Sequence, residues 1–263
     1  MHETARPLIL ITNDDGIDAP GLRALIEPME QVGQVVIVAP DQEQSAVGHG
    51  ISLTRPLRIT RQEPPRQYAV SGSPVDSVLM GIFKLCPRRP ELVVSGINHG
   101  LNVGTDVFYS GTVAAALEGA IQGLPALAVS QELPIDGGPP LEQLLARTAR
   151  FAAAVAGQIL EHRLPPQSVL NVNAPATGTD RYCFTRLGRR VYRELVDERL
   201  DLRGIPYYWI GGPVIHNTSG PGTDAHAAEA GIISLTLLNL DLSVEPPGGG
   251  AGWQIDGYRR GGD

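Results

Sequence analysis

The sequence predicts an α/β fold in which a mainly parallel sheet is covered by helices on both faces. Short apolar runs such as 8–12, 35–39 and 92–95 lack the polar alternation of a sheet with one face in water. Segments with helical spacing of apolar residues, or rich in alanine, separate these runs. Continuous apolar strands that alternate with helices are typical of a parallel sheet buried on both sides.

The elements of the first two thirds follow from these patterns in chain order. Pro20 to about Val32 has apolar residues at helical spacing, with Pro28 expected to shorten or bend that helix. Ser73-Pro74 is a typical helix start, with Ser73 as the N-cap. The expected strands are 8–12, 35–39, two short strands within 50–71 around Pro64-Pro65, 92–95, 126–129 and 169–173. The expected helices are 20–32, 75–85, 112–122 and 141–160.

The last third changes character. Residues 180–220 carry several Tyr and Trp side chains with charges between them and little helical period. We expect an extended or hairpin arm there that makes oligomer contacts. A short helix at 223–229 and a final strand at 232–237 follow. We assign residues 1–245 to one domain and interpret the Gly-rich segment 246–263 as a disordered tail.

Composition excludes several classes of protein. The chain has 263 residues, a formal charge of −7 and a pI near 5.4, so it lacks the basic surface expected of a protein that binds a nucleic-acid duplex. Cys86 and Cys183 are the only cysteines, which disfavours a zinc ribbon or a disulfide framework and fits a cytoplasmic protein. No apolar stretch is long enough to span a membrane, and no signal-like segment opens the chain.

The strongest functional indication lies where the first strand ends, at Asn13-Asp14-Asp15-Gly16. An unpaired buried charge is costly, and a divalent cation would supply the partner for two adjacent carboxylates. The alternative is that one Asp caps the next helix and the other closes a turn. We therefore expect a hard-metal site that handles phosphate, provided that other strand ends supply companions.

Such companions follow the next strands. Ser45 lies in a polar loop after 35–39, and Asn98 lies in a Gly-punctuated loop after 92–95. Together with Asp14 and Asp15 they offer four oxygen ligands. Ser110-Gly111-Thr112 begins the Ala-rich helix, where backbone N–H groups and hydroxyls make an anion site, although an ordinary N-cap is the better explanation of Ser110 and Thr112 in isolation.

This set favours hydrolysis of a phosphoryl group. A metal would polarise one phosphate oxygen and acidify a water molecule for attack, while fixed donors hold the other oxygens. Direct attack by Asp14 or Asp15 is the less favoured alternative, since metal binding weakens a carboxylate as a nucleophile. His49 and His99 are candidate general acids or plain surface histidines, and His226 is expected to be structural.

These segments resemble the SurE family, the survival-protein-E nucleotidases. The resemblance extends to about Leu242 and rests on these stretches: 11–16 with 19–21, 38–41 with Gln44-Ser45, 72–76, 94–98 with Gly100 and Asn102, 109–113 with 115–116 and 118–119, 171–175, and 223–224. Two departures are Ser73 where the family usually has Thr, and Thr236-Leu237-Leu238 where it usually has Thr-Pro-Leu.

The resemblance implies a metal-dependent phosphatase of nucleoside 5′- and 3′-monophosphates, with short polyphosphate as a further substrate in some members. It implies a Rossmann-like core, one Mg²⁺ or Mn²⁺, and a C-terminal arm exchanged between subunits of a homodimer or homotetramer. Metal ligands carry over to Asp14, Asp15, Ser45 and Asn98, of which the two Asp are also the catalytic positions. Phosphate-binding positions carry over to Asn13, Asn102, Ser110, Gly111 and Thr112.

Two other readings of the residues stay open or are disfavoured. A non-catalytic nucleotide- or phosphate-binding module would need only the Gly-rich loop and the helix start. Two adjacent carboxylates repel phosphate in such a module unless a cation intervenes. A haloacid-dehalogenase-type phosphatase expects Asp-x-Asp-x-Thr after the first strand, which Asp14-Asp15-Gly16 does not fit.

Overall fold

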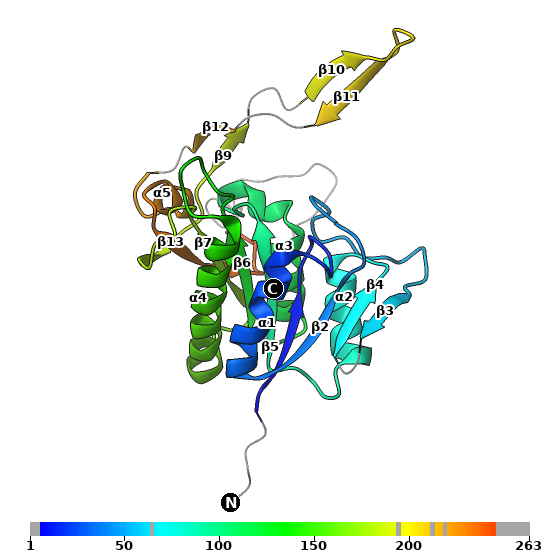
Figure 1. Cartoon of the computed structure of the whole chain (residues 1–263), viewed down its shortest axis with the longest axis vertical. Coiled ribbons are helices and arrows are strands. Elements are labelled where there is room, and N and C mark those ends of the chain that lie inside the picture. Colours follow the sequence, from blue (N-terminus) through cyan, green and yellow to red (C-terminus); the bar gives the residue numbers. More distant parts are fainter. Residues whose placement is uncertain (1–5, 64–65, 193–195, 211–213, 218–219, 246–263) are drawn as a thin grey trace, which may run out of the picture.

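The computed structural model describes residues 6–63, 66–192, 196–210, 214–217 and 220–245. The predicted disordered tail and the Pro64-Pro65 turn lie outside the described residues. The described strands form a nine-stranded sheet in the order β3-β4-β2-β1-β5-β6-β7-β13-β8, together with two separate two-stranded hairpins (Figure 1). This Rossmann-like α/β arrangement confirms the predicted fold class.

The elements match the predicted segments closely. Ser73 is the N-cap of α2, and its hydroxyl and the Asp76 carboxylate form a reciprocal capping box. The strands of the sheet are β1 (Leu8–Thr12), β2 (Gln34–Pro40), β3 (Ile59–Glu63), β4 (Gln67–Val70), β5 (Leu92–His99), β6 (Ala126–Gln131), β7 (Ser168–Ala174), β8 (Tyr182–Thr185) and β13 (Ile233–Asn239). The helices are α1 (Pro20–Val32), α2 (Pro74–Met80), α3 (Gly111–Ile121), α4 (Leu141–His162) and α5 (Asp224–Glu229), with a π-helical turn η1 (Gly81–Leu85) and a 3₁₀ turn η2 (Gly104–Phe108).

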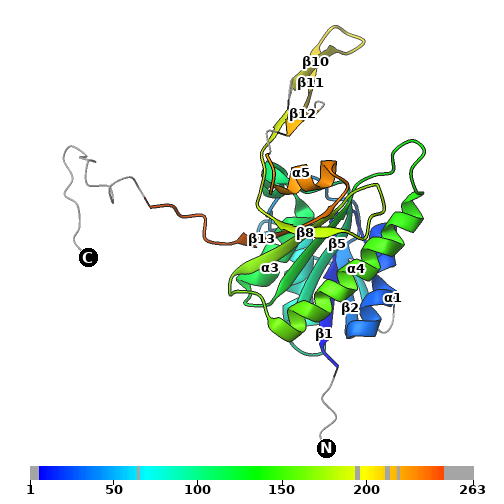
Figure 2. The ribbon, with the colours of Figure 1, turned by 90° about the vertical axis from the view of Figure 1, so that its left-hand side faces the viewer.

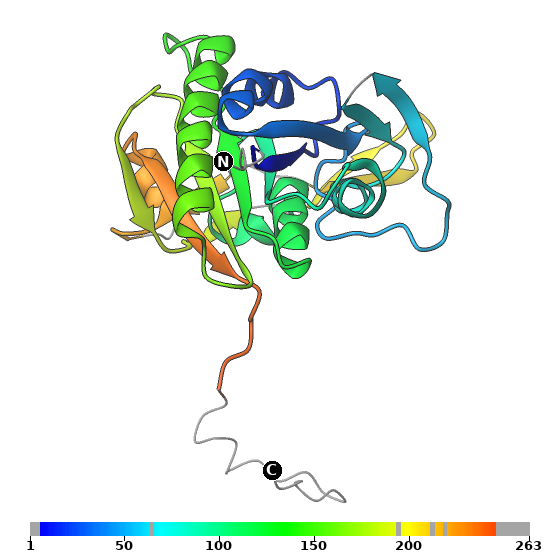
Figure 3. The same ribbon diagram turned by 90° about the horizontal axis from the view of Figure 1, so that it is seen from below.

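The sheet is the middle layer of three, and β1 shows how the sequence builds it. Ile9 and Ile11 pack into the apolar cluster beneath α1 and α4. Leu8 and Leu10 point the other way, into the cluster beneath α2 and α3. Because successive side chains of a strand face opposite sides, a strand that is apolar throughout has to be buried on both (Figure 3).

The topology places a switch point beside β1. Strands β4, β2, β1, β5, β6 and β7 are parallel, and β1 pairs with β2 on one side and with β5 on the other. Open α/β sheets bind ligands outside the carboxyl ends of their strands, at the point where the strand order reverses. The loops that follow β1, β2 and β5 therefore meet at the expected place.

The last third differs from the prediction in one respect. The segment 180–220 is not one arm, because β8 joins the central sheet as an edge strand parallel to β13. β13 itself runs antiparallel to β7. The rest forms the predicted hairpins, which project from the carboxyl end of the sheet (Figure 2): β9 (Arg190–Tyr192) pairs with β12 (Val214–Asn217), and β10 (Val196–Leu200) pairs with β11 (Pro206–Ile210). Of the described helices, none has the length and apolar character needed to cross a membrane.

Candidate active site

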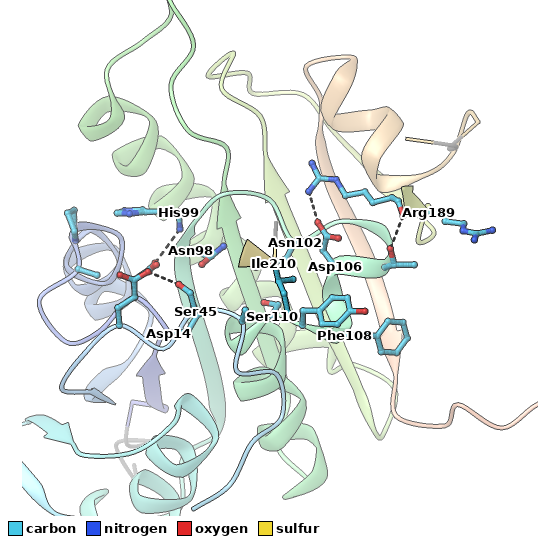
Figure 4. A pocket seen from close by; sticks show the side chains of 18 residues that line it. Asp14, Ser45, Asn98, His99, Asn102, Asp106, Phe108, Ser110, Arg189 and Ile210 are labelled. Atoms are coloured by element: carbon cyan, nitrogen blue, oxygen red, sulfur yellow. Dashed lines mark hydrogen bonds and ion pairs between the residues drawn. The ribbon is translucent and has the colours of Figure 1, made fainter. Parts of the chain in front are cut away.

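A cavity of about 1320 Å³ opens at the carboxyl ends of β1 and β5 (Figure 4). One end holds the four predicted metal ligands together with Glu43 and His99. Asn102, Ser110 and Ile210 lie between the two ends. The other end is lined by Asp106, Phe108 and Arg189, and Thr105 and Arg190 lie beside Asp106. The structure thus gathers side chains from several strand ends and from the arm into one cavity.

Asp14 is the most buried member of the set, with 5% of its surface exposed. Its Oδ1 accepts a hydrogen bond from the hydroxyl of Thr112, and the backbone N–H groups of Asp14 and Thr112 also hydrogen-bond to this carboxylate. Burial raises the pKa of Asp14 to about 6; the Thr112 hydroxyl opposes this shift and the charge of Asp15 adds to it. A buried carboxylate that has a raised pKa, and no ion-pair partner among the residues that the structure describes, is suited to hold a positive ion.

Asp15 lies beside it at the mouth of the cavity. Its Oδ2 accepts a hydrogen bond of 3.3 Å from the backbone N–H of His99, at the end of β5. Burial raises the pKa of Asp15, while His99 lowers it and the nearby charge of Glu43 raises it. Sequence reasoning placed Glu43 in a polar loop without a role, and the structure brings it to the carboxylate pair.

Ser45 and Asn98 complete the oxygen set. The Ser45 hydroxyl donates to Glu43 Oε1 at 2.7 Å, so its oxygen keeps lone pairs for a cation. The Asn98 amide donates to the carbonyl of Gly100 at 2.9 Å, which fixes the amide and leaves Oδ1 as an acceptor. Two carboxylates, a hydroxyl and an amide oxygen are a donor set that suits Mg²⁺ or Mn²⁺.

Among the described residues, no three His, Cys, Asp or Glu side chains cluster in a way that could hold a metal ion. The predicted ligand set stays a prediction, because two of its four donors are Ser and Asn, which are not of these residue types. The four oxygen donors present fit a single hard cation.

The start of α3 forms the floor beside Asp14. The Ser110 hydroxyl accepts the backbone N–H of Val113 at 3.0 Å, so Ser110 is the N-cap of α3 and also lines the cavity. Thr112 is fully buried with its hydroxyl on Asp14. The first N–H groups of a helix have no partner within it. That of Thr112 hydrogen-bonds to the Asp14 carboxylate, and that of Gly111 is a donor suited to an anion.

Asn102 is held by three side chains to which the sequence analysis gave no role at the site. Its Nδ2 donates to Ser130 Oγ at 2.9 Å, and its backbone carbonyl accepts from Asn171 Nδ2 at 2.9 Å and Asn173 Nδ2 at 3.2 Å. Its backbone N–H donates to Asn173 Oδ1 at 2.7 Å. The signal for this support was two Asn residues within an otherwise apolar buried strand.

The remaining predicted residues fall in different places. Asn13 is fully buried and does not line the cavity; its Nδ2 donates to the carbonyl of Gly16 at 2.9 Å and shapes the turn that carries the two Asp. His49 pairs with Glu118 at 2.9 Å outside the cavity lining, whereas His99 lines the cavity. His226 is exposed on α5. Cys86 is a free thiol that packs against an apolar cluster, as expected, and Cys183 is also free.

Fold and site together define a class: an α/β protein whose cavity at the topological switch point gathers carboxylate, hydroxyl and amide oxygens beside the start of a helix. Comparison with known proteins identifies the family. The model of the SurE family, described as survival protein SurE, matches residues 9–194. The chain therefore belongs to the SurE family.

Several relatives are similar over nearly the whole chain. A 5′-nucleotidase SurE of Anaeromyxobacter dehalogenans (strain 2CP-C) is 47% identical over 256 residues, covering 96% of this chain and 98% of the relative. That of Symbiobacterium thermophilum is 47% identical, covering 90% and 93%. The crystal structure of the SurE protein from Aquifex aeolicus superposes with a TM-score of 0.77 at 37% identity, covering 90% of this chain and 95% of that chain.

Proposed function

We propose that this protein is a divalent-metal-dependent phosphomonoesterase that hydrolyses nucleoside 5′- and 3′-monophosphates to nucleoside and phosphate. One observation carries the proposal: Asp14 and Asp15, at the end of the central strand β1, share a cavity with Ser45 and Asn98 and face the start of α3. Family membership and relatives named 5′-nucleotidase support the activity. We extend the proposal to short polyphosphate as a second substrate, because it presents the same terminal phosphoryl group.

Asp14, Asp15, Ser45 and Asn98 would hold one Mg²⁺ or Mn²⁺ through their carboxylate, hydroxyl and amide oxygens. When bound, the ion offsets the charge of the phosphate and makes water more acidic. Asp14 and Asp15 are the proposed catalytic residues. Thr112 and the His99 amide orient their carboxylates, so that the pair has one arrangement before substrate arrives.

The phosphate oxygens would be bound by Asn102, Ser110 and the backbone amides of Gly111 and Thr112. Asn102 is locked by Ser130 and by two Asn side chains of β7, and so needs little reordering. We include Asn13 in this set because its hydrogen bond to the Gly16 carbonyl fixes the backbone of the turn that carries Asp14 and Asp15. The nucleoside would extend along the cavity toward Phe108 and Ile210.

We further propose a homodimer or homotetramer held by the arm. Residues that lie opposite each other in the β10–β11 hairpin share a face, which places Val196 beside Ile210 and puts Leu200 on the same face, with Glu198 between Val196 and Leu200. The exposed fractions of Val196, Leu200 and Ile210 are 59%, 65% and 84%, which is unusual for apolar side chains that share one strand face. We also propose a cytoplasmic location, which the free thiols Cys86 and Cys183 support.

Phosphate release tests the proposed reaction. Adenosine 5′-monophosphate and adenosine 3′-monophosphate are incubated with the protein in Mn²⁺, in Mg²⁺ and in EDTA. Release that requires metal, and that falls to background in Asp14→Asn and Asp15→Asn, is the expected result. Tight nucleotide binding that persists in EDTA with no release would instead favour the alternative, a non-catalytic binding module.

A further inference from the structure

Asp224 is a fully buried carboxylate outside the cavity, and its partners are backbone amides. Oδ2 accepts the N–H of Gly104 at 2.8 Å, and Oδ1 accepts the N–H groups of Gly188 and Ala225, each at 2.8 Å. No ion pair to it occurs among the residues that the structure describes. Hydrogen bonds from several amides stabilise a buried carboxylate strongly, so the side chain joins α5 to two segments remote from it in sequence.

The two segments that Asp224 joins, at Gly104 and at Gly188, also approach each other closely. Gly104 has a φ of +57°, and a Cβ added there would lie 3.0 Å from the carbonyl oxygen of Gly188. Glycine permits both this backbone conformation and this approach. The spacing between η2 and the segment 186–190 is therefore set by the Asp224 carboxylate on one side and by backbone contact on the other.

These two segments line the end of the cavity that lies away from Asp14 and Asp15 (Figure 4). Gly104 begins η2, which carries Thr105, Asp106 and Phe108, and Gly188 directly precedes Arg189 and Arg190. A part-buried ion pair of 2.6 Å joins Arg190 to Asp106, and the Thr105 hydroxyl lies 3.3 Å from the Arg190 carbonyl. We call Thr105, Asp106, Phe108, Arg189 and Arg190 the far wall.

We propose that Asp224 is a positioning residue that sets the spacing of the far wall, and that through this wall the enzyme favours phosphate esters carrying a nucleoside over small ones. The inference rests on the proposed function. A substrate with its phosphate at the carboxylate end reaches the far wall only if its alcohol portion is large. Asp224 contacts neither end of the cavity directly, since it is absent from the lining.

The test variant is Asp224→Asn. It keeps the shape of the side chain but turns one accepting oxygen into an N–H₂ group that faces a backbone N–H. Glu132→Gln is the matched control, because Glu132 also accepts a backbone amide, that of Ala176 at 2.8 Å, and does not line the cavity. Asp224→Ala serves as a second variant that removes the acceptors without introducing a donor.

The first readout is hydrogen exchange by mass spectrometry. In Asp224→Asn and Asp224→Ala, peptides covering 101–109 and 186–190 should exchange at least ~10-fold faster than in the wild type, as expected when a buried hydrogen-bond acceptor is lost. The β6 peptide 126–131 should be unchanged, and Glu132→Gln should leave all three peptides unchanged. Unchanged exchange at 101–109 and 186–190 would overturn the positioning role.

The second readout is a substrate comparison. For Asp224→Asn, KM for adenosine 5′-monophosphate should rise about 10-fold, while kcat/KM for p-nitrophenyl phosphate should stay within about 3-fold of wild type. Equal losses on both substrates would indicate a general structural role and would overturn the selectivity role. If the wild type releases phosphate from neither compound, the proposed function fails, and the exchange comparison still decides whether Asp224 holds the far wall.

Discussion

At the scale of single residues, the account depends on the electrostatics of Asp14. Its folded-state pKa is raised above 3.8, to about 6, chiefly because the side chain is buried. The charged form therefore destabilises the metal-free fold above about pH 6, and this effect disappears below the unfolded pKa near 3.8. The shift corresponds to on the order of 3 kcal/mol, and a bound cation would reverse it.

Asp14→Asn should therefore stabilise the metal-free protein. In EDTA at pH 7.5, its midpoint of thermal unfolding should exceed that of the wild type, and the difference should shrink toward zero near pH 4, where the wild-type carboxyl is protonated. Adding Mn²⁺ should raise the wild-type midpoint and leave that of the variant unchanged. Scanning calorimetry across pH measures both effects.

Asp18→Asn is the matched control for this experiment. Hydrogen bonding from Arg61 lowers the pKa of this exposed carboxyl, with Arg23 contributing, so its charge does not oppose folding. The Asp18 variant should gain no stability in EDTA and should retain the response to Mn²⁺. If Asp14→Asn were no more stable than the wild type in EDTA at pH 7.5, burial of the Asp14 charge would not destabilise the metal-free fold.

Thr112 should affect the affinity for metal through its hydrogen bond to Asp14. In Thr112→Val the shape is kept but the hydroxyl that donates to Asp14 Oδ1 is lost, so Mn²⁺ should bind roughly 10-fold or more weakly by titration calorimetry. Thr148→Val is the control, because this buried hydroxyl donates at 2.6 Å to Gln131 instead. Equal affinity in the two variants would rule out this role for Thr112.

Some residues of the site could be predicted from local sequence, and others are placed by tertiary packing alone. Asp14, Asp15, Ser45 and Asn98 could be chosen from the sequence because each follows a strand, and parallel strands end at one edge. Asp224 could not be connected to Gly104 in this way. Nothing local indicates that a carboxylate on α5 will meet the amides of Gly104 and Gly188, because tertiary packing alone brings these segments together.

At the scale of elements, the start of α3 fits closely against the end of β1. A Cβ added to Gly111 would lie 2.8 Å from Asp14 Cβ and 2.9 Å from Oδ2. Alanine is a better helix former than glycine, so intrinsic propensity alone would favour the substitution. The glycine is explained by the room that the carboxylate needs.

Gly111→Ala should therefore displace the Asp14 carboxylate and lower kcat/KM about 100-fold, since small displacements at a reacting centre cost this much. Gly157→Ala in α4 is the control, because an added Cβ there meets nothing within 4 Å. That variant should keep full activity and gain about 0.5–1 kcal/mol in urea unfolding. Full activity of Gly111→Ala would refute the close-approach argument.

The element pattern was predictable where it depends on local sequence. The strands β1, β2, β5, β6 and β7 arise from apolar runs, the helices α1, α3 and α4 from helical spacing or alanine content, and Ser73 marks the start of α2. The place of β8 was not predictable. It is a short edge strand whose partner, β13, lies far along the chain, so its pairing is set by contacts that no local pattern shows.

At the scale of the whole molecule, the β10–β11 hairpin stands out because it exposes large apolar side chains. Val196 and Leu200 lie exposed on one face with Glu198 between them. Asp197 and Arg199 form an ion pair of 2.8 Å on the other face, beside exposed Tyr207 and Trp209. A projecting hairpin with exposed apolar and aromatic side chains is best explained by a second subunit that covers them.

Replacing both apolar residues should weaken assembly. Sedimentation velocity should find the wild type as a dimer or tetramer, and Val196→Ser/Leu200→Ser should dissociate at protein concentrations at least ~10-fold higher, because apolar contact area is lost. Asp197→Ser/Arg199→Ser is the control on the opposite face and should assemble like the wild type. A monomeric wild type would contradict the proposed role of the arm.

The central claim is that Asp14, Asp15, Ser45 and Asn98 bind one divalent ion. Crystals soaked in Mn²⁺ and phosphate, measured at the manganese absorption edge, test this claim most directly. The account predicts a single anomalous peak within about 2.0–2.6 Å of oxygens from these four side chains, with phosphate between the ion and the start of α3. A peak bound by other residues, or phosphate held at α3 with no ion at the four oxygens, would contradict it.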